Sequence, residues 1–336
     1  MKKLVLLIFV ISASVRSQDL DFNNYLLIGV EGAEELTAIY LEPLSEGITY
    51  ALTGGWYKSA AVRDKWSLGL SLVTNGSFIP SERLSKDLNI GEIENLEVVG
   101  GGNIVAIPTI LGSKESTVTL IATVDGDQIT FDAPTGIGLI NLNLLPSAFL
   151  QAELGLPANF ELGLRYFPKI NVSDVTLGMT GIGLKHEISK SIKALDRGPL
   201  AVSGMVAFTR LSTDYSFRTD GFVRGENQFA EGHINTWLFE LIASTKNPVY
   251  NLYGGIGYVQ GEAEYALKGT YIIQTENDTI IFQDPFDVQN SVSGWRLNLG
   301  ASVRMGWFNL NLGYTFQGFN NLSLGLNFDV LNSKRN

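Results

Sequence analysis

The segment WRLNLGASVRM at residues 295–305 is followed by FNLNLGYTF at 308–316 and by NLSLGLNFDV at 321–330. In all three, large apolar residues alternate with Asn, Gly, Ser, Thr and charged residues at a period of two. This period is typical of β-strands, whose successive side chains point to opposite faces of a sheet. Because the joins are only a few residues long, the three predicted strands must run antiparallel.

The same alternation predicts further strands upstream. It is clear in Trp66–Leu72, Leu150–Leu156 and Phe160–Tyr166. Weaker candidates lie at Ile48–Tyr57, Val118–Val124, Val175–Lys185, Leu200–Thr209, Ile234–Ala243, Leu252–Tyr258 and Tyr271–Phe282. With allowance for merged hairpins, the pattern predicts an all-β chain of about twelve to fourteen antiparallel strands.

Alternation is shared by transmembrane β-barrels and soluble β-sandwiches, but other features favour a transmembrane barrel. The clearest strands run about ten residues, the length of a tilted membrane crossing. Only 17% of residues are charged, against roughly a quarter in soluble domains. Polar positions are rich in Asn, Ser, Thr and Gly, and aromatic residues fall at strand ends. The residues predicted to form interface girdles are Trp56, Trp66, Tyr166, Trp295, Trp307 and Phe316.

The first residues, Met1–Ser17, begin with two lysines, continue with an apolar run and end in small or polar residues. This order predicts a secretory signal peptide cleaved near Ser17. An uncleaved anchor is disfavoured because the apolar run is far shorter than the ~20 residues of a spanning helix. We therefore expect the mature chain in the outer membrane of a Gram-negative bacterium, with outer-membrane lipid and the barrel-assembly machinery as partners.

Three parts are predicted: the signal peptide at 1–17, an N-terminal periplasmic or plug segment at 18–46, and the barrel at 47–331. In the second part, Glu31–Leu44 has helical spacing, with acidic residues at its start and Pro43 at its end. This short helix could plug the barrel or pack on the periplasmic rim. The rim is slightly favoured, because about a dozen residues form only three or four turns and would not fill a wide lumen.

Composition and motifs argue against several function classes. The chain has no cysteine, which removes disulfides, thiolate metal sites and cysteine nucleophiles. A net charge of −10 disfavours nucleic acid as a partner. No HExxH motif is present, the glycine clusters do not precede a helix, and Asp125 and Asp127 are interpreted as turn residues rather than calcium ligands. No metal or other cofactor is predicted.

Two histidines, His186 and His233, are the candidates for acid–base catalysis. Neither has a serine two positions away, the spacing that would place a hydroxyl beside the ring on one strand. A site assembled across strands, from His233 with Glu231 or Glu240, stays open. We assign no catalytic residue and predict that the chain is not an enzyme.

Charged residues at the polar strand positions are expected to face the lumen. They are Glu153, Glu161, Arg165, Glu240, Arg296, Arg304 and Asp329. These charges could select ions or solutes along an open pore. Alternatively, the acids and bases could neutralise one another and close the lumen. The sequence does not give the register across strands, so both alternatives stay open.

The opening of the chain resembles that of uncharacterised outer-membrane β-barrel proteins of the Bacteroidetes, a family defined by a domain of unknown function. The matching residues are Tyr40, Leu41, Glu42, Pro43, Leu44, Gly47, Leu52, Gly55, Trp56, Tyr57 and the run Pro108–Gly112. The layout of a leading segment before a barrel is distantly similar to the long-chain fatty-acid transporter family, although its Asn-Pro-Ala hatch motif is absent. The first family has no assigned activity, so the resemblance carries over no catalytic residue. The function that we predict is a porin-like channel or transporter for a small or hydrophobic solute. The alternatives are an outer-membrane lipid hydrolase and a structural or surface-interaction barrel.

Overall fold

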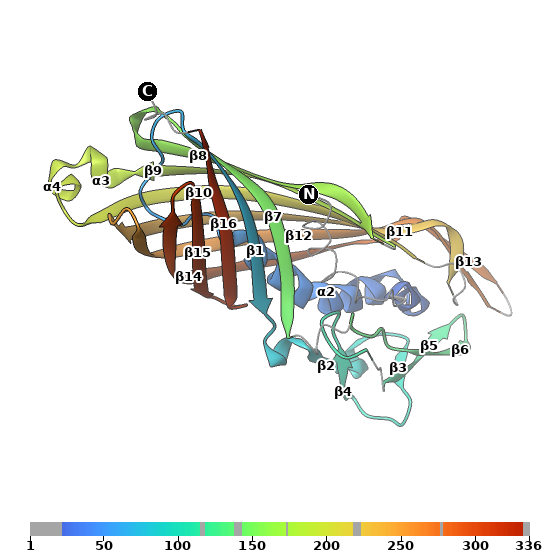
Figure 1. Ribbon diagram of the computed structural model, residues 1–336. Helices are drawn as coiled ribbons and strands as arrows, with labels where there is room; N and C mark the ends of the chain where they lie inside the picture. Colours follow the sequence, from blue (N-terminus) through green and yellow to red (C-terminus); the bar gives the residue numbers. More distant parts are fainter. Residues whose placement is uncertain are drawn as a thin grey trace.

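The computed structural model describes residues 22–114, 118–137, 143–172, 174–217, 223–275 and 278–331. The main body is a closed, antiparallel β-barrel (Figure 1). The predicted signal peptide lies outside the described residues.

Ten strands form the barrel, and each is hydrogen-bonded to the next along the chain. Pairing of the first strand with the last closes it, with Leu72 opposite Leu326. The barrel strands are β1 (Leu68–Phe78), β7 (Leu144–Gly155), β8 (Phe160–Val172), β9 (Val175–Glu187), β10 (Leu200–Ser216), β11 (Arg224–Thr245), β12 (Tyr250–Gln274), β14 (Asp287–Met305), β15 (Phe308–Phe316) and β16 (Asn321–Leu331). The antiparallel barrel predicted from the alternation and the short joins is confirmed.

The barrel nevertheless has fewer strands than the predicted number of about twelve to fourteen. Residues 48–57 are the end of a helix and the turn after it, and Val118–Val124 belongs to a sheet outside the barrel. Residues 271–282 cover the end of β12 and β13 (Thr279–Gln283), which folds back on β12. The length of β12, 25 residues, explains this last difference, because the two alternating stretches at Leu252–Tyr258 and from Tyr271 belong to one strand.

The two ends of the barrel differ. At the end where β1 begins and β16 ends, the turn end, short turns join β7 to β8, β11 to β12 and β14 to β15. At the opposite end, the cap end, residues 79–143 connect β1 to β7. Figure 1 shows β11 and β12 reaching far beyond β15 and β16 at the cap end. In outer-membrane barrels short turns face the periplasm and long connections face outward.

The described part of residues 79–143 forms a small subdomain, the cap. It holds one sheet of β2 (Ser85–Asn89) and β4 (Ile104–Pro108), and another of β3 (Leu96–Val98), β5 (Thr119–Val124) and β6 (Asp127–Asp132). In Figure 1 a long helix, α2, lies between the cap and the extended strands. The apolar core of the cap is continuous with buried residues of that helix.

Helix α2 (Val30–Thr53) follows the short 3-10 helix η1 (Phe22–Ile28) and continues past both ends of the predicted helix, with Pro43 in its interior. It contacts β1, β7, β11, β12 and β14, so it lies in the lumen and not on the rim. Most residues of its second half are buried, polar ones included. A helix enclosed by a barrel wall has no single apolar stripe, and this is why its alternating Ile48, Tyr50 and Leu52 resembled a strand.

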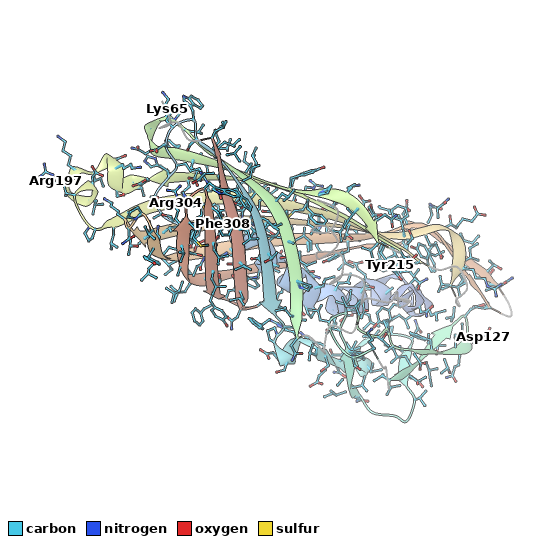
Figure 2. The ribbon with its side chains drawn as sticks, viewed as in Figure 1. Lys65, Asp127, Arg197, Tyr215, Arg304 and Phe308 are labelled. Carbon is cyan, nitrogen blue, oxygen red and sulfur yellow. The ribbon has the colours of Figure 1, made fainter. Side chains whose placement is uncertain are left out.

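Two further short helices, α3 (Ile188–Ser191) and α4 (Lys193–Asp196), lie between β9 and β10 at the turn end. In Figure 2, Arg197 just after α4 lies at the opposite end of the molecule from Asp127 of the cap. Within the described ranges, no helix is both long enough and apolar enough to cross a membrane.

The strands present polar residues to the lumen and apolar residues to the outside. On β7, Gln151 and Glu153 are buried whereas Leu150 is 56% exposed. On β14, Arg296 is buried whereas Leu297 is 45% exposed. A soluble domain buries its apolar side chains, so this inverted arrangement matches a barrel surrounded by lipid.

Candidate functional site in the barrel lumen

After helix α2, the chain continues through the lumen to the turn end, where β1 begins. Helix α2 and residues 54–67 together are named the lumen segment. A chain inside a closed barrel has no free sheet edge to pair with, so its backbone needs other partners. Side chains of the wall supply them: Gln151 donates to the Trp56 carbonyl at 3.1 Å, and the Ala60 N–H donates to Ser244 Oγ at 3.0 Å.

This backbone recognition extends to the turn end. The Val62 N–H donates to Glu187 Oε2 at 2.9 Å, and the Arg63 N–H donates to Glu161 Oε2 at 2.8 Å. The wall partners thus come from β7, β8, β9 and β11. The lumen segment is therefore held in one register against the wall from several sides.

Two arginines of the wall bind the C-terminal end of helix α2. Arg165 of β8 donates to the carbonyls of Leu52 at 2.9 Å and Gly54 at 2.8 Å, and Arg296 of β14 donates to that of Thr53 at 2.8 Å. Both arginines are only 2% exposed. The last carbonyls of a helix lack intrahelical partners and carry partial negative charge, so cations stabilise this end.

Arg165 also stacks on aromatic rings. Its Cζ lies 3.8 Å from the ring centroid of Trp56 and 4.3 Å from that of Phe149, and its Nε donates to Gln151 Oε1 at 2.7 Å. A planar guanidinium can stack and donate a fork of hydrogen bonds at once. Arg165 therefore connects the wall, the helix end and the chain after it.

Nearer the turn end, cations of the lumen segment pair with acids of the wall. Glu153 Oε2 lies 2.6 Å from Lys58 Nζ and 3.1 Å from Arg63 Nε. Within the wall, Lys185 Nζ lies 2.8 Å from Glu161 Oε1. These side chains line a cavity of about 50 Å³, about the volume of one or two water molecules. Here the lumen has room for little more than water.

Another charged contact lies beside Tyr57, whose hydroxyl donates to Glu240 Oε1 at 2.6 Å. The other oxygen of Glu240, Oε2, lies 3.7 Å from Arg296 Nε. A Cβ at Gly255 would lie 2.4 Å from the Tyr57 hydroxyl, so glycine makes room for this contact. Tyr57 thus links the lumen segment to a buried ion pair of the wall.

Helix α2 approaches β12 and β14 closely because glycines face it. A Cβ at Gly261 would lie 2.5 Å from Thr49 Cγ2, and one at Gly294 would lie 2.5 Å from the Tyr50 hydroxyl. A larger residue at either position would displace the helix or its side chains. The glycines of these two strands thus form the seat of the helix.

At the cap end, helix α2 is bonded to the cap. The Tyr40 hydroxyl donates to the Thr135 carbonyl at 2.6 Å, and Arg83 Nε lies 3.0 Å from Glu46 Oε2. Burial raises the pKa of the Glu46 carboxyl, and the positive charge of Arg83 opposes that rise. Burial also raises the pKa of Tyr25 in η1. The cap and the first half of the lumen segment therefore pack as one unit at the barrel mouth.

Five of the charges expected to face the lumen are buried in the contacts above: Glu153, Glu161, Arg165, Glu240 and Arg296. The other two lie at the turn end, where Asp329 Oδ1 accepts a hydrogen bond from Arg63 at 2.7 Å and Asp329 Oδ2 pairs with Arg304. Figure 2 shows Arg304 among the strands of this end. Six of the seven take part in ion pairs among the described residues, whereas Arg165 binds carbonyls of the lumen segment, Gln151 and two aromatic rings.

Five of the residues predicted for the interface girdles are 49% to 71% exposed on the outer face: Trp66, Tyr166, Trp295, Trp307 and Phe316. The prediction was wrong for Trp56, which is 4% exposed and lies in the lumen against Arg165. Trp56 follows a helix and does not end a strand, so it never reaches the outer face. Contact of the other five with a lipid interface stays a prediction.

Sequence reasoning missed the partners that the lumen segment contributes. Lys58 and Arg63 lie between predicted strands, where no alternation assigns them a face, and Tyr57 ends a predicted strand that is in fact a helix and a turn. The sequence did contain one signal for these contacts. Two cations lie just before the first barrel strand, and the polar positions of the following strands carry acids that need partners. Only the register of the wall strands shows which acid each cation meets.

The histidines lie apart from these contacts. His186 stacks on Phe160 with ring centroids 4.2 Å apart. Of the two partners left open for His233, both on its own strand β11, Glu231 contacts it at 2.8 Å, whereas Glu240 faces the lumen. Among the described residues, no group of three His, Cys, Asp or Glu side chains could hold a metal ion.

Residues 1–330 match the model of a protein family described as "Family of unknown function (DUF6588)". The chain belongs to this family. The match agrees with the resemblance to an uncharacterised barrel family, while an origin in the Bacteroidetes stays a prediction. A comparison of this DUF6588 protein with curated proteins finds no match.

Solved structures similar to this DUF6588 protein are outer-membrane β-barrels. Ail of Yersinia pestis is 9% identical over 79% of this chain and 99% of its own, with a TM-score of 0.27. The translocator domain of the autotransporter NalP of Neisseria meningitidis is 15% identical over 88% and 98%, with a TM-score of 0.28. A FadL homologue of Pseudomonas aeruginosa is 11% identical over 88% and 98%, with a TM-score of 0.23. Structural similarity this weak gives no information about the activity of the chain.

Proposed function

We propose that this protein is an outer-membrane barrel whose lumen is closed by its own N-terminal segment and opens to a small or hydrophobic solute when that segment moves. The observation that carries the proposal is the polar attachment of the lumen segment. Wall side chains bind the backbone of residues 52–63, and Lys58 and Arg63 pair with wall acids. Polar contacts can be exchanged for water one at a time, whereas an apolar core must be exposed as a unit.

Placement in a membrane rests on the outer face of the barrel. Exposed large apolar residues recur along the strands, among them Leu150, Leu241, Leu297 and Leu312. A contiguous apolar surface of this kind is unfavourable in water and marks a membrane or protein contact. Together with the predicted signal peptide and the long cap connection at one end, this surface supports the outer membrane of a Gram-negative bacterium as the location that we propose.

The charge of the cap bears on which solutes would enter. Residues 79–143 contain nine Asp or Glu and three Lys or Arg. An acidic mouth repels anions and raises the local concentration of cations. We therefore expect neutral or cationic solutes to pass more readily than anions once the lumen segment has moved.

A disulfide between the lumen segment and the wall tests the proposal. A Cβ at Gly54 would lie 3.0 Å from Asn75 Cγ on β1, so Gly54→Cys with Asn75→Cys places two Cβ atoms near the spacing of about 3.5–4.5 Å found in disulfides. The natural chain has no cysteine to interfere. The refolded protein is inserted in a planar bilayer with a KCl gradient, and conductance is recorded before and after reduction.

We expect the oxidised double variant to stay closed and its reduced form to show the openings of the wild type, with a reversal potential that favours cations. The single variants Gly54→Cys and Asn75→Cys are the matched controls, and neither should respond to the reductant. Equal conductance in the oxidised and reduced double variant, with the disulfide verified by mass spectrometry, would contradict the proposal. If the inserted wild-type barrel shows no openings, and none appear when the lumen segment is loosened, the transport function is contradicted. The lipid-hydrolase and surface-interaction alternatives then remain.

A further inference from the structure

Three side chains form a hydrogen-bonded row on the outer face of β10 and β11. His233 Nδ1 lies 3.2 Å from Ser212 Oγ, and His233 Nε2 lies 2.8 Å from Glu231 Oε1. Ser212 is directly opposite His233 in the strand register, and Glu231 is two residues before it on the same face. We propose that these residues are a Ser–His–Glu acyl-transfer site that cleaves esters of medium-length acyl chains. In Figure 2 the label of Tyr215 marks this end of β10.

The contacts assign each nitrogen of the ring. A neutral imidazole donates from one nitrogen and accepts at the other. With the Nε2 proton donated to Glu231, Nδ1 is free to accept the proton of Ser212, which activates the hydroxyl as a nucleophile. Asp214 lies opposite Glu231 and Glu264 lies opposite His233 in the register. Their negative charges stabilise the imidazolium that forms.

The reaction then follows the two steps of acyl transfer. Ser212 Oγ attacks the ester carbonyl carbon while its proton passes to His233, and the carbon–oxygen bond to the alcohol breaks as the alcohol takes that proton. Water next attacks the acyl-serine, its proton passes through His233 to Ser212 Oγ, and the carboxylic acid leaves. The backbone around Ser212 is paired on both sides, so the oxyanion needs a side-chain donor. Arg210, exposed and two residues before Ser212 on this face, is positioned for that role.

The neighbouring surface indicates an acyl substrate. Phe208 lies on the same face four residues before Ser212, about 13 Å along the strand. Its ring centroid is 4.8 Å from that of Trp237, which stacks on Phe239 at 6.2 Å. Trp237 and Phe239 are 45% and 48% exposed. An acyl chain laid along these rings brings its ester carbonyl to Ser212, at the border between the apolar and polar parts of the outer face.

Hydrolysis of p-nitrophenyl octanoate and p-nitrophenyl acetate by the refolded full chain tests the site. We expect faster turnover of the octanoate, and a fall in kcat of about 10²- to 10⁴-fold for Ser212→Ala and for His233→Ala. His186→Ala, which removes the other histidine, is the matched control and should keep the wild-type rate. Trp237→Ala should raise KM for the octanoate and leave the acetate unchanged.

Glu231 acts through His233 and is a positioning residue. Glu231→Gln should lower kcat with little change in KM, because the neutral amide holds the ring tautomer and orientation less well than the carboxylate. A fluorophosphonate probe should label Ser212 of the wild type, as read by mass spectrometry. A folded wild type with neither turnover nor labelling would overturn the proposal, as would wild-type turnover by Ser212→Ala. Because the site lies outside the lumen, it can fail without affecting the proposed transport function.

Discussion

At the scale of single residues, Arg165 shows how the wall holds the lumen segment. Its guanidinium is buried, and its contacts are carbonyls of the helix end, Gln151 and two aromatic rings. The sequence indicated that Arg165 faces the lumen, because it occupies a polar position of an alternating strand. Its partners Leu52 and Gly54 lie far away in the chain, so only the folded barrel identifies them.

Replacing Arg165 should loosen the lumen segment while the barrel remains. Arg165→Met leaves two helix carbonyls unpaired, and loss of charged hydrogen bonds of this kind costs about 3 kcal/mol. Arg165→Lys should recover only part of this, because an ammonium cannot reproduce the planar fork or the stacking. The readouts are the urea midpoint of unfolding and trypsin cleavage after Lys58 and Arg63. Wild-type protection from trypsin in Arg165→Met would show that the contact is not what retains the segment.

At the scale of elements, helix α2 and its glycine seat determine whether the lumen is filled. The spacing of Glu31–Leu44 predicted a helix but not its continuation to Thr53, because the wall, not an apolar stripe, stabilises the second half. Close approach to β12 depends on the missing side chain of Gly261. Glycines in a strand reduce its intrinsic stability, and close packing offsets this cost.

A larger residue at position 261 should displace helix α2 from the barrel wall. Gly261→Val inserts atoms where Thr49 already lies, and overpacking of this kind destabilises by about 1–3 kcal/mol. Gly204→Val on β10 is the control, since a Cβ there meets only Ile188 Cδ1 at 3.7 Å. The midpoint of urea unfolding and the single-channel open fraction should change in the first variant alone. Equal values in both variants would mean that the seat does not hold the helix.

At the scale of the whole molecule, the inverted polarity of the barrel predicts where lipid lies. Leu297 is outward and 45% exposed within the apolar part of β14. Glu262 of β12 is also outward, but it lies in the polar part of the face toward the cap end. The loss of stability caused by a charge placed on the outer face therefore indicates the depth of that position in the bilayer.

Leu297→Arg should destabilise the vesicle-inserted barrel by about 2–4 kcal/mol, whereas Glu262→Arg should cost about 0–1 kcal/mol. The measurement is reversible urea unfolding in lipid vesicles, with insertion followed by the gel mobility of unboiled protein. An equal loss of unfolding free energy in the two variants would mean that both residues have the same surroundings, and it would contradict the proposed membrane position.

The sequence by itself determined the antiparallel strands, because alternation at period two with short joins is a local property that permits one mode of pairing. It also determined the face of each strand position, and so most of the wall charges of the lumen. The closing pair of strands, the cap and the path of the lumen segment were decided only by tertiary structure. These depend on contacts between residues distant in the chain, such as Trp56 with Arg165 and Ser212 with His233, for which no local pattern gives a partner.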